Sequence, residues 1–124
     1  MSLQFEIDVA SHLVNVTGVS ETSVGEIREA VEAMVEDPRF DREMQVLGDF
    51  REMRWIPSTQ EVKDLAKFIG TIQKNHRPRT ALVVSNDLLY GVARIFSLLA
   101  KTKGYRARPF KDLSTARAWL ELDA

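Results

Sequence analysis

Residues 81–84, a run of four consecutive apolar side chains, restrict the fold of this chain more than any other segment. A strand with one face in water alternates apolar and polar side chains, whereas an unbroken apolar run is typical of a strand covered on both faces. We therefore expect a central strand over residues 79–85, in a sheet that carries helices on both sides.

Strand and helix patterns alternate along the chain. Period-two alternation over residues 5–9 and a second apolar segment over residues 13–18 predict an opening hairpin. Further strands are predicted over residues 44–47 and 105–110. With a helix after each strand from the second onward, the order is β-β-α-β-α-β-α-β-α, which predicts an α/β fold with a five-stranded mixed sheet.

Capping residues and apolar spacing predict the helices. The S-x-x-E spacings at residues 23–26 and 58–61 are capping boxes for the first two helices. One residue among 85–87 can cap the third helix, and Asp112 or Ser114 the fourth. The third helix is predicted to turn one apolar stripe toward the sheet: Leu88, Leu89, Val92, Ile95, Phe96 and Leu99.

Composition excludes several kinds of site. The chain has no cysteine and only two histidines, His12 and His76, which excludes disulfides, thiolate sites and multi-histidine metal centres. No apolar run approaches the ~20 residues that cross a bilayer. Residues 1–10 lack the basic and then apolar order of a signal peptide. We therefore expect a cytoplasmic protein with a single domain over residues 1–124 and no membrane span.

Charge is divided unevenly along the chain. Residues 1–62 carry 5 basic and 13 acidic side chains, whereas residues 63–124 carry 12 basic and 5 acidic ones, for a net charge of −1. A basic surface could attract nucleic acid, an acidic lipid surface or an acidic partner. The alternative is that the two halves neutralise each other in the fold.

The basic cluster near the last predicted strand does not favour nucleic acid. It comprises Lys101, Lys103, Arg106, Arg108 and Lys111. The two aromatic residues among them, Tyr105 and Phe110, are an odd number of positions apart, so they lie on opposite faces of a strand and cannot form one stacking platform. Lysine, arginine and Pro109 are also what protects an edge strand from pairing with other chains.

Polar side chains follow two of the predicted strands where those strands end. In open α/β sheets ligands bind beyond the carboxyl ends of the strands, and a helix N-terminus there favours anions. The predicted crevice for a ligand or partner is lined by Asp49, Arg51, Ser58, Ser85, Asn86, Asp87 and Tyr90. The alternative is that these residues only cap helices and end strands.

Known catalytic patterns are missing from the sequence. There is no G-x-S-x-G elbow, no phosphate-binding G-x-x-x-x-G-K-[ST] loop and no G-x-G-x-x-G fingerprint. We expect a protein that is not an enzyme and holds no cofactor or metal. A small enzyme working in the crevice is the weaker alternative.

Asp49-Phe50, followed by Ser58-Thr59 at the start of the second helix, resembles the signature of the STAS domain, the fold of sporulation anti-sigma-factor antagonists. In those antagonists a partner kinase phosphorylates a serine at this helix start. The resemblance implies that Ser58 is a phosphosite, with Thr59 beside it, and that the partner is a regulatory kinase or an anti-sigma-like protein. The chain departs from the family's pattern at Arg51, Pro57 and Gln60.

The C-terminal half resembles a divergent branch of that family, the SpoIIAA-like proteins described as STAS/SEC14-like. The similar features are the strand-to-helix step at residues 83–86, the strand at 105–110 and the closing Ala118-Trp119-Leu120. This resemblance implies a single STAS-like domain.

The sequence therefore predicts a regulatory or binding module that acts through protein contacts near the start of the second helix. A small-ligand or lipid binder that uses the crevice is the alternative. A homodimer also fits the sequence, through either the hairpin edge or an exposed segment at residues 50–55.

Overall fold

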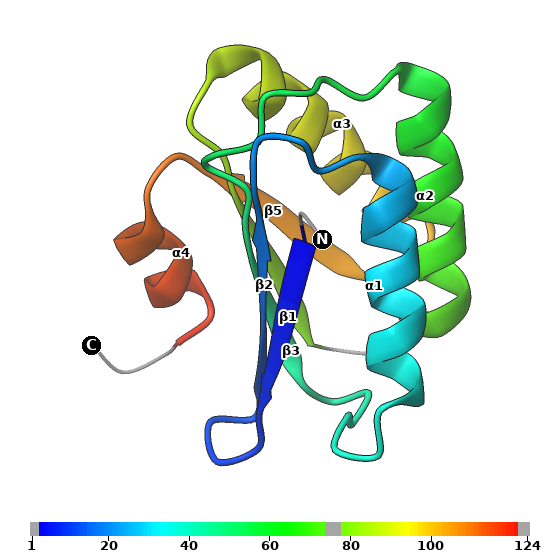
Figure 1. Ribbon diagram of the computed structural model, residues 1–124, viewed down its shortest axis with the longest axis vertical. Coiled ribbons are helices and arrows are strands. Elements are labelled where there is room, and N and C mark those ends of the chain that lie inside the picture. The colour runs from blue at the N-terminus through cyan, green and yellow to red at the C-terminus, as the bar shows by residue number, and fades with distance from the viewer. Residues whose placement is uncertain (1–2, 74–77, 122–124) are drawn as a thin grey trace.

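The computed structural model describes residues 3–73 and 78–121, and its elements follow the predicted order (Figure 1). The strands are β1 (Leu3–Asp8), β2 (Leu13–Gly18), β3 (Gln45–Asp49), β4 (Arg79–Val83) and β5 (Arg106–Phe110). The helices are α1 (Val24–Glu36), α2 (Thr59–Gln73), α3 (Asp87–Thr102) and α4 (Leu113–Trp119).

The strands form one mixed sheet in the order β1-β2-β3-β4-β5. β1 and β2 are antiparallel, and the three pairs that follow are parallel. β4 is internal, between β3 and β5, as its apolar run predicted, although β3 holds the middle position. β5 forms one edge of the sheet, as Pro109 predicted.

Helices α1, α2 and α3 cover one face of the sheet, and α4 covers the other (Figure 1). This explains the unbroken apolar run. Ala81 and Val83 pack in the cluster that contains Ala116 and Leu120 on the α4 side. Leu82 packs on the opposite side, with residues of α2 and α3. The predicted α/β fold with helices on both faces is therefore confirmed.

The predicted helix starts are confirmed by side-chain hydrogen bonds. Ser23 Oγ accepts from the Glu26 N–H at 3.3 Å and caps α1. Among the three candidates for α3, Asn86 is the cap, since its Oδ1 accepts from the Leu89 N–H at 2.8 Å. Asp112 caps α4. Because the caps sit where parallel strands end, they fix the polar edge of the sheet.

The opening hairpin is shifted from its prediction. β1 ends at Asp8, and Val9, predicted to lie in the strand, is in the turn and 58% exposed. The turn needs His12 in the left-handed region, at φ 55°. His12 therefore lies at the hairpin turn as predicted, while His76 lies outside the described residues.

Two predictions of burial and one of exposure are wrong. Leu88 and Ile95 of the predicted inward stripe are 72% and 42% exposed, because α3 buries a face turned away from them, through Leu89, Ala93, Phe96 and Ala100. Phe50, predicted to be exposed, is only 8% exposed because its ring packs against Leu3, Met53, Val84 and Leu89.

Tyr105 and Phe110 lie on opposite faces of the sheet, as predicted. Tyr105 packs with α2 and α3, and Phe110 packs with α4. Across residues 3–73 and 78–121, no helix combines the length and hydrophobicity needed to cross a membrane.

Candidate functional site

The first group of predicted crevice residues joins the ends of β3 and β4. The Arg51 side chain donates two hydrogen bonds to the Asp49 carboxylate, at 2.9 and 2.8 Å. These bonds hold the pKa of Asp49 below its ordinary value. Ser85 Oγ donates to the Arg51 carbonyl oxygen at 2.6 Å. The three residues therefore fasten one strand-end loop to the next.

The second group lies at the start of α3. Asp87 forms an ion pair with Lys111, and that pair lowers the pKa of the Asp87 carboxyl group. The Lys111 ammonium also lies 5.1 Å from the centre of the Tyr90 ring. Lys111 was missing from the predicted crevice. The signal for it was available, because Lys111 directly follows β5, whose last residue Phe110 pairs with Val83 in register.

Ser58 and Thr59 lie apart from both groups in their contacts. The Ser58 backbone N–H donates to Glu61 Oε1 at 2.9 Å, and the Glu61 N–H donates to Ser58 Oγ at 3.2 Å. This is the predicted capping box of α2. Both Ser58 and Thr59 are exposed, so a modifying enzyme could reach their hydroxyl groups.

Helix caps and ion pairs thus account for the polar groups of most predicted crevice residues. Within the described ranges, no group of three or more His, Cys, Asp or Glu side chains is placed to hold a metal ion. The edge of the sheet offers polar surface, and a partly open cavity lies one layer deeper.

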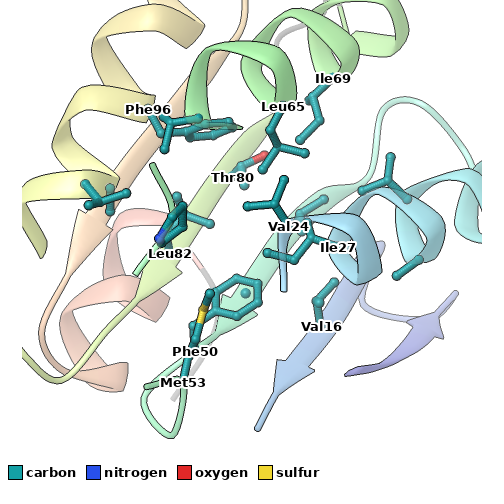
Figure 2. Close-up of a pocket in the computed structure, with 18 of the residues that line it drawn as sticks. Val16, Val24, Ile27, Phe50, Met53, Leu65, Ile69, Thr80, Leu82 and Phe96 are labelled. Atoms are coloured by element: carbon teal, nitrogen blue, oxygen red, sulfur yellow. The ribbon is translucent and has the colours of Figure 1, made fainter. Parts of the chain in front are cut away.

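A cavity of about 140 Å³ lies between the sheet and helices α1, α2 and α3 (Figure 2). The strands β2, β3 and β4 form its floor, and the three helices form its roof. Phe50 and Met53 close one end, while Ile69 lies toward the other (Figure 2). Further wall residues are Val16, Ile27, Leu65, Leu82 and Phe96.

The walls of the cavity are almost entirely carbon. Two wall residues carry a hydroxyl group, Tyr105 and Thr80. The Tyr105 hydroxyl is already used, since it donates to the Ala66 carbonyl oxygen at 2.9 Å. In the described part of the chain no hydrogen bond is formed by the Thr80 hydroxyl. A molecule in the cavity would therefore meet a wall that exposes almost no polar surface.

None of the predicted crevice residues lines this cavity. The predicted apolar stripes of α1 and α2 do supply wall residues, so the sequence indicated which faces turn inward. It carried no signal for the unfilled volume, because a cavity depends on how side chains from distant segments meet. The loop before Ser58 connects the polar edge of the sheet with the cavity, because its residues Met53 and Pro57 belong to the cavity wall.

Comparison with known proteins bears on the fold. No protein-family model and no curated protein matches the chain. A crystal structure that resembles it is that of an uncharacterised protein of the DUF3478 family from Shewanella loihica, described as having a SpoIIAA-like fold. The two structures superpose with a TM-score of 0.59 and 15% sequence identity, over 96% of this chain and 94% of the other. The chain therefore has the SpoIIAA-like fold that its sequence resemblance implied.

Proposed function

We propose that this chain is a non-enzymatic, cytoplasmic binding module that takes a small apolar molecule into the cavity between the sheet and helices α1, α2 and α3. The observation that carries the proposal is the cavity itself, with its volume of about 140 Å³ and its walls of carbon. Protein interiors are otherwise close-packed, with few voids larger than a water molecule.

The energetics of an empty cavity favour an occupant. At about 24 cal/mol per Å³, a fully buried cavity of this size would cost about 3 kcal/mol, and this is the upper bound for a cavity that is partly open. Even part of that cost is a sizeable share of the roughly 5–15 kcal/mol that stabilises a folded domain. Water recovers little of that cost, because the wall offers it few hydrogen-bond partners. An apolar ligand restores the missing contacts.

The volume sets the size of the ligand. An engineered cavity of about 150 Å³ in another protein holds one benzene molecule. The space here therefore suits a single ring or a short branched chain. A long lipid chain fits only if the helices move apart. Because the wall exposes almost no polar surface, it favours a largely apolar ring such as indole over a strongly polar molecule.

Indole is a suitable probe, with binding measured by isothermal titration calorimetry and by shifts of the methyl NMR signals of Ile27, Leu65 and Ile69. Ala30 lines the cavity, whereas Ala33 lies on the exposed side of the same helix. Ala30→Leu fills the space and should weaken indole binding about tenfold or more, the effect of losing about 1.4 kcal/mol of contact. Ala33→Leu is the matched control and should bind indole as the wild type does.

Two results would contradict the proposal. One is a wild-type chain that shows no methyl shifts at millimolar indole. The other is equal binding by the wild type and Ala30→Leu, which would place the indole elsewhere on the protein.

Protein contact near the start of α2 is the second candidate function. The observation in its favour is that Trp55 and Ile56, both large and apolar, are exposed directly before Ser58. Such a patch suits a protein partner, whether a regulatory kinase, an anti-sigma-like protein or a second copy. Native mass spectrometry of the chain purified from its own cells tests the phosphosite. A phosphate on Ser58 or Thr59 supports this candidate, and a bare mass counts against it.

A further inference from the structure

Helix α3 carries a second apolar stripe that faces away from the sheet. Leu88, Ile95 and Leu98 are 72%, 42% and 65% exposed. Gly91 is exposed as well, and with these three residues it recurs at helical spacing along one side of α3. Exposed apolar side chains that gather in one stripe mark an interaction surface, whereas single ones do not.

Gly91 forms a hollow in the middle of this stripe. Apart from the two chain neighbours and the backbone of the same helix, no atom of the described residues would lie within 4 Å of a Cβ added at this glycine. A glycine inside a helix costs about 1 kcal/mol relative to alanine, and packing among residues 3–73 and 78–121 does not explain its presence. The missing side chain leaves room for a large residue from outside, with Leu88 and Leu98 at either end.

The stripe is complementary to itself when it is reversed. Its positions are symmetric about residue 93, since Leu88 and Leu98 each lie five residues away and Gly91 and Ile95 each lie two. In an antiparallel pair centred there, Ile95 of each copy lies opposite Gly91 of the other. Leu88 of each copy lies opposite Leu98 of the other. The Ile95 side chain of each copy thus fits the hollow at Gly91 of the other copy.

Charge selects the same orientation. Asp87, Arg94 and Lys101 are exposed and recur every seven residues along one flank of the stripe. In the antiparallel pair, Asp87 of each copy lies within about 3 Å, along the helix axis, of Lys101 of the other. The pair thus has two contacts between opposite charges and one repulsive contact, between the two Arg94 side chains. The Asp87 carboxylate also forms an ion pair with Lys111 of its own chain. In a parallel pair this flank would face the opposite flank of the partner helix, so Asp87 and Lys101 would not meet.

We propose that two copies of this chain form a two-fold symmetric dimer in which their α3 helices pack antiparallel through Leu88, Gly91, Ile95 and Leu98. This surface differs from the hairpin edge and from residues 50–55, and it does not involve the cavity. The dimer should be weak and concentration-dependent, because one helix face is small beside the ~1,600 Å² of a stable interface.

Sedimentation equilibrium over a range of concentrations tests the surface. The wild type should shift from monomer to dimer. Leu98→Asp should raise the dimer dissociation constant about tenfold or more, because it brings an unpaired charge into an apolar contact. Val9→Asp is the matched control, since Val9 is comparably exposed but lies in the hairpin turn. Leu88→Asp is a second variant in case Leu98→Asp unfolds.

Cross-linking tests the orientation, and the lack of native cysteine makes it specific. When Gly91→Cys protein is mixed with Ile95→Cys protein under oxidation, the disulfide should join one variant to the other. Each variant alone should cross-link poorly. A wild type that stays monomeric at millimolar concentration overturns the proposal and leaves the stripe to a different protein. Dimers that survive both Asp variants, or variants that cross-link mainly to themselves, overturn it as well.

Discussion

The Phe50 ring lies so close to Gly48 that a Cβ on that glycine would be 2.7 Å from the ring carbon Cε2. A Cβ on Gly18 would be equally close to Cδ1 of the same ring. The two glycines, one in β2 and one in β3, thus form a recess that holds the ring down on the sheet. Because Phe50 is also a wall residue of the cavity, this recess helps to keep the cavity open.

Gly48→Ala should displace the Phe50 ring and destabilise the fold by about 1–3 kcal/mol, the range for overpacking a core. The ring has open space on its cavity side, so we expect it to move there and weaken indole binding. Urea unfolding and calorimetry measure the two effects. Gly25→Ala is the control, since its nearest neighbouring atom is 3.8 Å away, and it should be neutral or stabilising. Normal stability and binding in Gly48→Ala would show that the recess has no such role.

Tyr105→Phe should lower the free energy of unfolding by about 1 kcal/mol at neutral pH. It removes the hydrogen bond from the Tyr105 hydroxyl to the Ala66 carbonyl oxygen while keeping the ring in the core. Urea unfolding at pH 7 measures the loss. A variant as stable as the wild type would show that this hydrogen bond does not contribute to the free energy of unfolding.

The same residue predicts an alkaline limit to stability. Burial raises the pKa of Tyr105 above its ordinary value of 10.0, so the folded state favours the neutral phenol. Its contribution is fully present below pH 10 and falls as the pH rises further, where the unfolded chain loses the proton first. Wild-type stability should therefore decline more steeply above pH 10 than that of Tyr105→Phe. Parallel declines would contradict this.

Arg51→Ala should raise the pKa of Asp49 toward its ordinary value, because hydrogen bonds from Arg51 are the main cause of the lowering. NMR titration of the carboxyl carbons measures it. In the wild type this pair contributes stability above the ordinary pKa of 3.8 that is lost as the pH falls through the lower, folded-state pKa. Arg39→Ala is the control: it should raise the pKa of Asp37, which Arg39 holds at about 2, and leave that of Asp49 unchanged.

Local patterns predicted the fold because each element was fixed by residues near it in sequence. The capping boxes at Ser23 and Ser58 marked where α1 and α2 begin, and Pro109 marked the sheet edge. The errors came from contacts between distant segments. Phe50 is buried because Gly18, far from it in the chain, leaves room for its ring. Leu88 and Ile95 fit an apolar helix stripe in sequence, yet the helix rotates to bury Ala93 and Ala100 instead.

The candidate site was predicted less well than the fold. The sequence identified the polar edge, and Asp49, Arg51 and Ser85 do meet there. It could not show that these groups bond mainly to one another and to the backbone, since this depends on side-chain geometry. The cavity could not be predicted from the sequence for a related reason. An apolar residue such as Ile27 or Leu65 has the same pattern in sequence whether it faces another side chain or an empty space.

Ser58→Ala should lower the free energy of unfolding by about 1 kcal/mol, because it removes the side-chain oxygen that accepts from the Glu61 N–H at the start of α2. Ser58→Asp should recover most of this loss, since aspartate accepts the same bond and its charge suits a helix N-terminus. Thr59→Ala is the control and should change stability by less than about 0.5 kcal/mol. Urea unfolding compares the three. If Ser58→Asp is the least stable, α2 does not tolerate negative charge at its cap, and a phosphate on Ser58 would then open the helix start instead of reinforcing it.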